Sequence, residues 1–167
     1  MRLGSLGLRI TVGAFFVGHG TQKLFGWFGG GGLQATSQAF EQLGLRPGRP
    51  NAIAAGVAEA GGGALLASGL ANPLAASVLT ATMLTAIRRV HAKNGPWATN
   101  GGYEYNVVLI AAALALAPPH TDRRSAREQH SDSAWTLAAL LAGLAGAAGA
   151  EIAAKQPAST AQPTPAS

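Results

Sequence analysis

The 167-residue chain contains no cysteine. This absence excludes disulfides, thiolate catalysis, iron–sulfur clusters and cysteine-based zinc sites. No serine–histidine–aspartate set, carboxylate pair or metal-binding motif stands out either, so we expect no metal. The missing thiols do not identify a compartment, because a chain without them tolerates any redox conditions.

Charge is scarce as well. Asp, Glu, Lys and Arg together make up 11% of the chain, against roughly 25% in an ordinary soluble domain. Hydrophobic residues reach 48%, although many of them are alanine. This composition favours a membrane protein. The alternative is a soluble bundle of buried helices, but its outer helices would carry a polar stripe that these segments lack.

The net charge of +5 raises the question of nucleic acid. The basic residues, however, lie mostly at the ends of apolar stretches, as Arg46 and Arg49 do. No basic face with interleaved aromatic residues is present, so we expect no nucleic-acid binding. Flanking charge of this kind suits lipid headgroups and the control of topology.

Long apolar stretches predict an all-α fold, a polytopic membrane four-helix bundle. About 20 residues cross a ~30 Å hydrocarbon core at 1.5 Å per residue. Turn-forming segments at Gly29–Gly32, 46–50 and Asn72-Pro73 and a polar loop at 91–102 separate the stretches. A short helix over 36–43 is expected on the surface. The four predicted spans are residues 3–28, 51–71, 74–90 and 103–117.

The C-terminal part carries one more apolar stretch. Residues 121–133 are polar, and 134–150 are seventeen uncharged residues rich in Ala and Gly. The latter could form a fifth span, a surface helix or a helix packed on the bundle. The predicted organisation is a four-helix membrane domain, a polar linker with an additional apolar helix, and a disordered tail, over residues 1–118, 119–153 and 154–167.

Polar residues gather at one side of the predicted bundle. In four antiparallel spans, the ends of spans one and three and the starts of spans two and four lie on the same side. Glu59 lies roughly 13 Å deep in the second span and should be protonated or paired. Lys23 is within reach, and Arg88 and His91 are rival partners. The predicted cluster comprises His19, Gln22, Lys23, Glu59, Arg88, His91, Tyr103, Glu104, Tyr105 and Asn106.

Three interpretations of this cluster stay open: a charge network that fixes helix packing, a site for a polar or redox-active small molecule, and a contact with a partner protein. For a site, Lys23, Arg88 and Arg89 could attract an anion, while His91 or Glu59 could carry protons. Haem held between His19 and His91 is the weaker possibility, because polar neighbours crowd both residues.

Small residues recur at helical spacing in the second span. Gly56, Ala60 and Gly63 form one such row. A face of small residues lets two helices approach closely in lipid. The alternative is a simple bias of the chain toward Ala and Gly.

Residues 19–30, with the sequence HGTQKLFGWFGG, resemble the signature that ends the first helix of the DoxX family. The resemblance continues in order and spacing over residues 5 to 118, and the stretch after Pro119 departs from the family pattern. The further matching segments are Phe40–Leu45, Glu59–Gly62, Val90-His91, Asn94-Gly95 and Gly101–Asn106, which reads GGYEYN.

The resemblance to these DoxX/DoxD-like integral membrane proteins implies a multi-pass protein of the bacterial inner (plasma) membrane with four transmembrane helices. It implies a subunit of a membrane-associated redox system, linked to thiosulfate and quinone or to oxidative stress. Such a chain, without cysteine, would depend on a bound quinone or a partner subunit for electrons, and soluble redox enzymes are possible partners. The alternatives are a membrane scaffold for soluble redox enzymes and a small-molecule transporter. Homo-oligomerisation and membrane orientation stay open.

Overall fold

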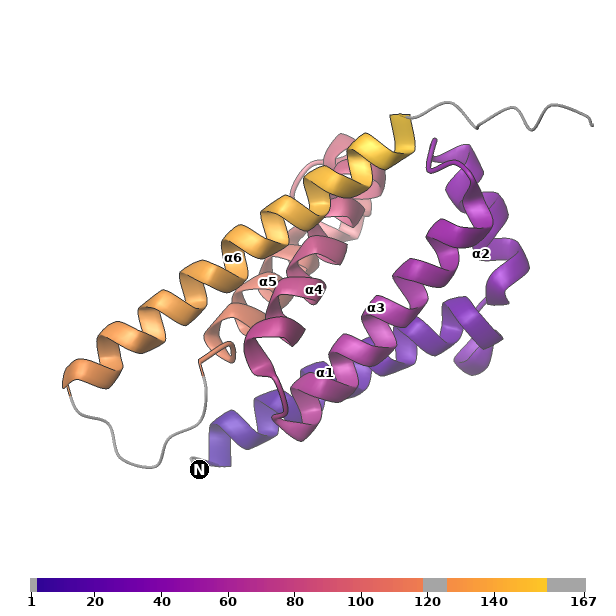
Figure 1. Cartoon of the computed structure of the whole chain (residues 1–167). Coiled ribbons are helices and arrows are strands. Elements are labelled where there is room, and N and C mark those ends of the chain that lie inside the picture. Colours follow the sequence, from indigo (N-terminus) through magenta and orange to yellow (C-terminus); the bar gives the residue numbers. More distant parts are fainter. Residues whose placement is uncertain (1–2, 119–125, 156–167) are drawn as a thin grey trace, which may run out of the picture.

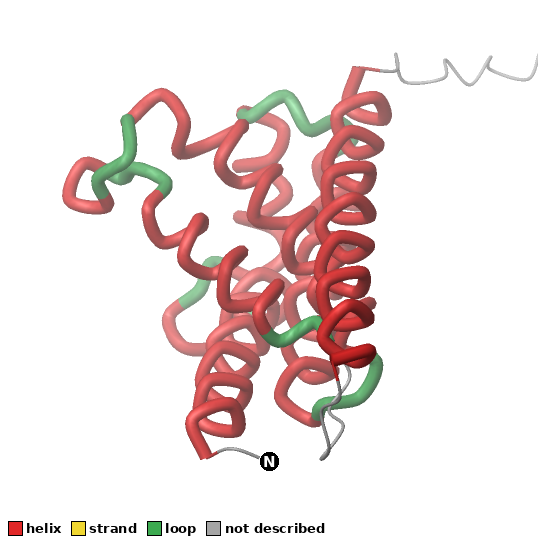
Figure 2. Tube along the Cα trace, turned by 90° about the vertical axis from the view of Figure 1, so that its left-hand side faces the viewer, coloured by secondary structure: helices red, strands yellow, loops and turns green. Residues whose placement is uncertain are grey.

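The computed structural model describes residues 3–118 and 126–155. Every secondary-structure element in this part of the chain is a helix, which confirms the all-α prediction (Figure 1). The view turned by 90° shows the helix that leads to the C-terminus running along one edge of the molecule (Figure 2). The α-helices are α1 (Leu3–Phe25), α2 (Gly32–Gln42), α3 (Gly48–Ser68), α4 (Asn72–Ala86), α5 (Glu104–Ala115) and α6 (Ala126–Lys155).

Short helical turns join these elements. A π-helical turn, η2 (Ile87–His91), continues α4 and carries its basic residues. It leads into the 3₁₀ turns η3 (Ala92–Asn94) and η4 (Ala98–Asn100), which lie in the expected polar loop. Another 3₁₀ turn, η1 (Trp27–Gly29), follows α1.

The four expected spans correspond to α1, α3, α4 with η2, and α5, but the end of α1 and both ends of α3 were wrong, with α3 ending at Ser68 rather than at residue 71. Helix α1 stops at Phe25 because Gly26 takes the left-handed conformation, with φ 75°. Helix α3 begins at Gly48, inside the expected loop 46–50. Pro50 fits there because the first turn of a helix needs no backbone N–H donors. The short surface helix also begins earlier than expected, at Gly32.

Helix α6 answers part of the question about the C-terminal stretch. It begins at Ala126, within the predicted polar linker, and continues through the whole apolar run to Lys155. The rest of the predicted linker and most of the predicted tail, residues 119–125 and 156–167, lie outside the described residues.

Helices α1 and α3 approach closely through glycine. A Cβ added at Gly20 would lie 2.5 Å from the carbonyl oxygen of Gly56 and 2.7 Å from the Cβ of Ala60. One added at Gly13 would lie 2.6 Å from the carbonyl oxygen of Gly63. The predicted face of small residues on α3 is therefore where α1 packs.

Helix α4 is central, because it packs against α3, α5 and α6. The largest fully buried side chains around it are Phe16, Leu66, Leu79 and Thr80. Helix α6 runs alongside α4 (Figure 1). Gly143 of α6 faces the side chain of Thr80, where an added Cβ would come within 2.7 Å.

The outer faces of the helices are apolar. Phe15, Val57, Leu74, Val108 and Leu141, one from each of five helices, are exposed. Among the described residues, the segment Asp132–Ile152 of α6 is the helix long and apolar enough to cross a membrane by length and composition, and α5 is a shorter apolar helix. The crossing of the membrane by four helices stays a prediction.

Candidate functional site

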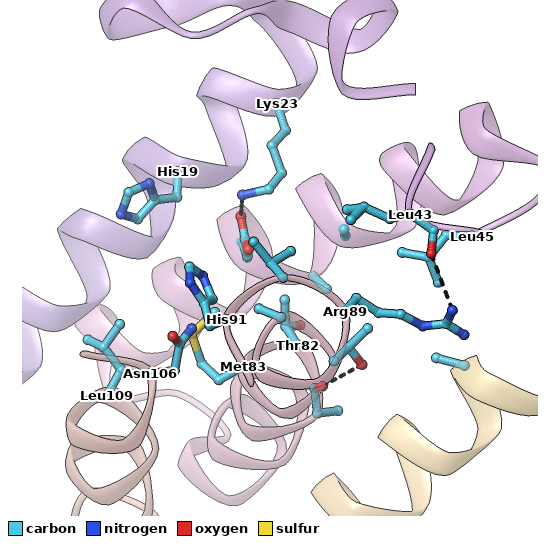
Figure 3. Close-up of a pocket in the computed structure, with 18 of the residues that line it drawn as sticks. His19, Lys23, Leu43, Leu45, Thr82, Met83, Arg89, His91, Asn106 and Leu109 are labelled. Atoms are coloured by element: carbon cyan, nitrogen blue, oxygen red, sulfur yellow. Dashed lines mark hydrogen bonds and ion pairs between the residues drawn. The ribbon is translucent and has the colours of Figure 1, made fainter. Parts of the chain in front are cut away.

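A cavity of about 610 Å³ lies between the helices, on the side where the polar residues were expected. All six α-helices contribute to its lining, which is mostly aliphatic. Figure 3 shows His19, His91 and Asn106 on one side of this region, while Arg89 extends away from them toward Leu43 and Leu45.

Lys23 and Glu59 form an ion pair on the cavity wall. The Lys23 Nζ donates to Glu59 Oε2 at 2.5 Å. Glu59 is only 4% exposed, so this partner compensates a charge that would be costly alone. The structure therefore selects Lys23 among the three partners considered for Glu59.

His19 lies one helical turn before Lys23 on α1, so both side chains line the cavity. His19 Nδ1 is 3.0 Å from Gln22 Oε1, and Gln22 Nε2 donates to the carbonyl oxygen of Phe28 at 3.3 Å. Because the second bond fixes the amide, the oxygen that faces His19 accepts a hydrogen from Nδ1. This leaves Nε2 of His19 for other partners.

His91 is fixed in the same way. Its Nδ1 is 2.7 Å from the carbonyl oxygen of Gly101, to which Asn94 Nδ2 also donates at 3.1 Å. A carbonyl oxygen only accepts, so Nδ1 of His91 carries the hydrogen. The His91 Nε2 is then the nitrogen left for proton exchange or for a ligand.

Asn106 is buried at the start of α5. Its Nδ2 donates to the thioether sulfur of Met83 at 3.4 Å. Sulfur of this kind is a weak acceptor. A ligand oxygen that reached this amide would therefore replace a weak bond with a stronger one.

Arg89 makes the most extensive polar contacts of the cavity lining. Its Nε and Nη2 donate to the two carboxylate oxygens of Glu151 at 2.8 and 2.7 Å. Its Nη1 donates to the carbonyl oxygen of Leu43 at 3.2 Å. Arg88 stands farther off, with its Nη2 3.7 Å from Glu151 Oε2.

The structure thus brings together six of the ten predicted residues. The six that line the cavity are His19, Lys23, Glu59, His91, Tyr105 and Asn106. The lining does not include the other four, which are Gln22, Arg88, Tyr103 and Glu104. Within the described residues no group of three or more histidines and carboxylates could hold a metal ion.

Glu151 was not among the predicted residues, and Arg89 was not part of the predicted cluster. Glu151 directly follows the run of seventeen uncharged residues. An acid beside such a run needs a nearby cation, just as Glu59 does in the second predicted span. In the C-terminal stretch the same reasoning predicts that Glu151 needs a cation, but it does not identify Arg89 as that cation.

Charge is balanced around the cavity. Lys23 and Arg89 are each neutralised by a carboxylate, and the remaining walls are largely apolar. Such a site suits a ligand with an apolar body and a few polar groups.

A model of the DoxX family matches residues 4–92. This chain belongs to the DoxX family. The match covers α1 to α4 and η2, and it includes Lys23, Glu59 and His91 of the cavity wall. The match confirms the resemblance inferred from residues 19–30. Proteins of the DoxX family are generally membrane-associated.

A curated relative supports the assignment. The DoxX chain is 32% identical over 114 residues to the protein named "Putative oxidoreductase CatD" of Bacillus subtilis (strain 168). The alignment covers 68% of this chain and 78% of the relative. No solved structure matches the chain.

Proposed function

We propose that this DoxX protein crosses the bacterial inner membrane several times and binds a redox-active small molecule of the quinone class in its cavity, as the membrane subunit of a redox system. One observation carries the proposal: an apolar cavity between helices holds an ion pair and two histidines whose Nε2 atoms are left open. The name of the Bacillus relative, "Putative oxidoreductase CatD", agrees with a redox role.

The distribution of polarity supports the membrane part of this proposal. Large apolar side chains such as Phe15 and Val57 are exposed on the outside, whereas the charged Arg9, Glu59 and Glu151 are buried. This is the reverse of a soluble bundle, and it suits hydrocarbon outside and a polar interior. Helix α1, with 23 residues, is about 34 Å long and would span a bilayer core.

The cavity residues fit a quinone. Its ring would lie against the aliphatic walls, and its carbonyl oxygens would accept hydrogen bonds from groups such as the Asn106 amide. A bound quinone supplies the capacity to accept electrons and protons. The imidazoles of His19 and His91 can each hold or pass a proton at Nε2, the ring nitrogen that remains after Nδ1 has donated its hydrogen bond.

Electrons would come from a partner. The chain has no cysteine to exchange them. We infer a soluble redox enzyme at the membrane surface, with thiosulfate-linked or oxidative-stress chemistry. The chain's own residues would bind the quinone, exclude water from it and move protons.

The membrane arrangement can be tested directly because introduced cysteines have no background. Ser68→Cys precedes the α3–α4 turn and Thr99→Cys lies in the loop before α5, and both positions are exposed. In sealed vesicles an impermeant maleimide should label one of the two variants, and it should label the other only after permeabilisation. Equal labelling of both from one side would contradict the multi-pass arrangement.

Ligand binding is tested with the purified full chain in lipid nanodiscs and a short-chain benzoquinone. We expect saturable binding, weakened about tenfold by His91→Phe, as for the loss of one hydrogen bond. Tyr103→Phe is the matched control, because Tyr103 lies outside the cavity lining and should bind like wild type. No saturable binding to wild type would contradict the quinone site and leave the scaffold as the better account.

A further inference from the structure

We propose that the Arg89–Glu151 pair is a latch that holds α6 closed over one side of the cavity, and that its release admits ligand from the membrane. The inference concerns access to the cavity and goes beyond the proposed redox function. It does not depend on which molecule binds.

Helix α6 forms a side wall of the cavity. Gly146 and Ala150 belong to the lining. The helix rests on α4 mainly through small residues, since Gly143 faces Thr80 and Gly146 faces Ala81. Small residues of this kind let the two helix backbones approach closely, without large side chains of α6 interlocked at these two positions.

Arg89 connects α6 to the end of α2 on the other side of the cavity. Its guanidinium bonds in bidentate fashion to Glu151 near the end of α6, and it also donates to the carbonyl oxygen of Leu43 at the end of α2. Figure 3 shows the side chain stretched toward Leu43. One planar donor group therefore bridges three parts of the chain across the rim of the cavity.

The position of this bridge suits repeated opening. The side chains of Arg89 and Glu151 are 21% and 11% exposed, so solvent or headgroups can replace their bonds. The Nη2 of Arg88 lies 3.7 Å from Oε2 of the same carboxylate. Arg88 would therefore supply a second cation to Glu151 when the bonds to Arg89 break. In the described core cluster with Phe16 and Leu79, α6 contributes Ala139, about three helical turns before Glu151, so the movement proposed for the last turns of α6 begins beyond it.

The opening would face the bilayer. Leu141, Leu144 and Ile152 on α6 are exposed, so the outer face of this helix is apolar. A hydrophobic ligand is concentrated in that phase. A movement of the last turns of α6 away from Leu43 would give such a ligand a path to the cavity without passing through water.

The test measures access to the cavity by cysteine labelling of the full-length protein in nanodiscs. Ala55→Cys places a thiol in the cavity lining, and Ala64→Cys places one on the exposed face of the same helix. Both are labelled with N-ethylmaleimide in three backgrounds: otherwise wild type, Glu151→Gln and Arg46→Gln. The last is the matched control, because it breaks the exposed Arg46–Glu41 pair away from α6.

We expect Glu151→Gln to speed labelling at Ala55→Cys by roughly tenfold or more, the factor for losing one charge-assisted hydrogen bond. Arg46→Gln should leave that rate unchanged, and Ala64→Cys should react equally fast in all three backgrounds. A charge swap, Arg89→Glu with Glu151→Arg, should slow Ala55→Cys labelling again.

Two results would overturn the latch. One is an equal rate at Ala55→Cys with and without Glu151; the other is an increase at both cysteines, which reports general loosening. The assay uses no quinone. It can therefore fail while quinone binding succeeds, or succeed while quinone binding fails.

Discussion

The Lys23 ammonium of α1 reaches across to the buried Glu59 carboxylate of α3. The two residues are 36 positions apart in the sequence. They are brought together because glycines let α1 and α3 approach closely just beside them, at Gly20 and Gly56. The ion pair and the glycine crossing are therefore two parts of one arrangement.

Lys23→Met should destabilise the protein strongly. The substitution keeps an apolar stem of similar length but leaves the Glu59 carboxylate buried without its cation. Breaking a buried pair from one side costs on the order of 3 kcal/mol. The free energy of unfolding in detergent, from denaturant titration, measures the loss.

The control is Arg46→Gln, which removes an exposed ion pair with Glu41 and should cost less than about 1 kcal/mol. Combining Lys23→Met with Glu59→Leu should recover part of the lost stability, because no charge is then left buried. If Lys23→Met costs no more than the control, the pair does not stabilise the fold.

Gly20→Ala should weaken the contact between α1 and α3. The added methyl group would meet backbone atoms of Gly56 and Ala60 that cannot move aside separately. Overpacking of this kind costs about 1–3 kcal/mol. Gly18→Ala on the same helix is the comparison, since nothing lies within 4 Å of its added Cβ. Thermal unfolding should show a lower Tm for the first variant and an unchanged or higher Tm for the second.

Gly143→Val should lift α6 from α4. Its side chain would collide with the Cβ of Thr80, whereas Gly149→Val, further along the same helix, enters open space. We expect limited proteolysis to cut the chain near α6 faster in Gly143→Val, by roughly fivefold for a loss of about 1 kcal/mol in helix docking. Equal cleavage of the two variants would show that this contact does not hold α6.

The sequence carried enough information for the helices, because their apolar runs and glycine or proline interruptions are local signals. It also indicated that Glu59 needs a cation nearby, because an isolated acid in an apolar span is costly. It left Lys23, Arg88 and His91 as candidates for that cation. Helix ends were harder. Gly48 begins α3 inside a segment rich in proline. The composition of that segment predicts a loop, and only the geometry of the first turn shows that the helix has begun.

Long-range packing could not be predicted in the same way. Arg9 of α1 is only 5% exposed, and its guanidinium lies against Gly69 at the end of α3, a contact that no local sequence pattern indicates. The pairing of Arg89 with Glu151 depends on where α6 docks, and α6 lies beyond the part of the chain that the family model matches. Apolar helices of similar composition give no sequence signal for which neighbour they choose.

Filling the cavity tests the central claim most directly. Ala58→Trp puts a large side chain into the lining, and Ala64→Trp puts the same side chain on the exposed face of the same helix. The dissociation constant of a short-chain benzoquinone should rise at least about tenfold for Ala58→Trp and stay at the wild-type value for Ala64→Trp. Equal affinity of Ala58→Trp and wild type would contradict binding in this cavity.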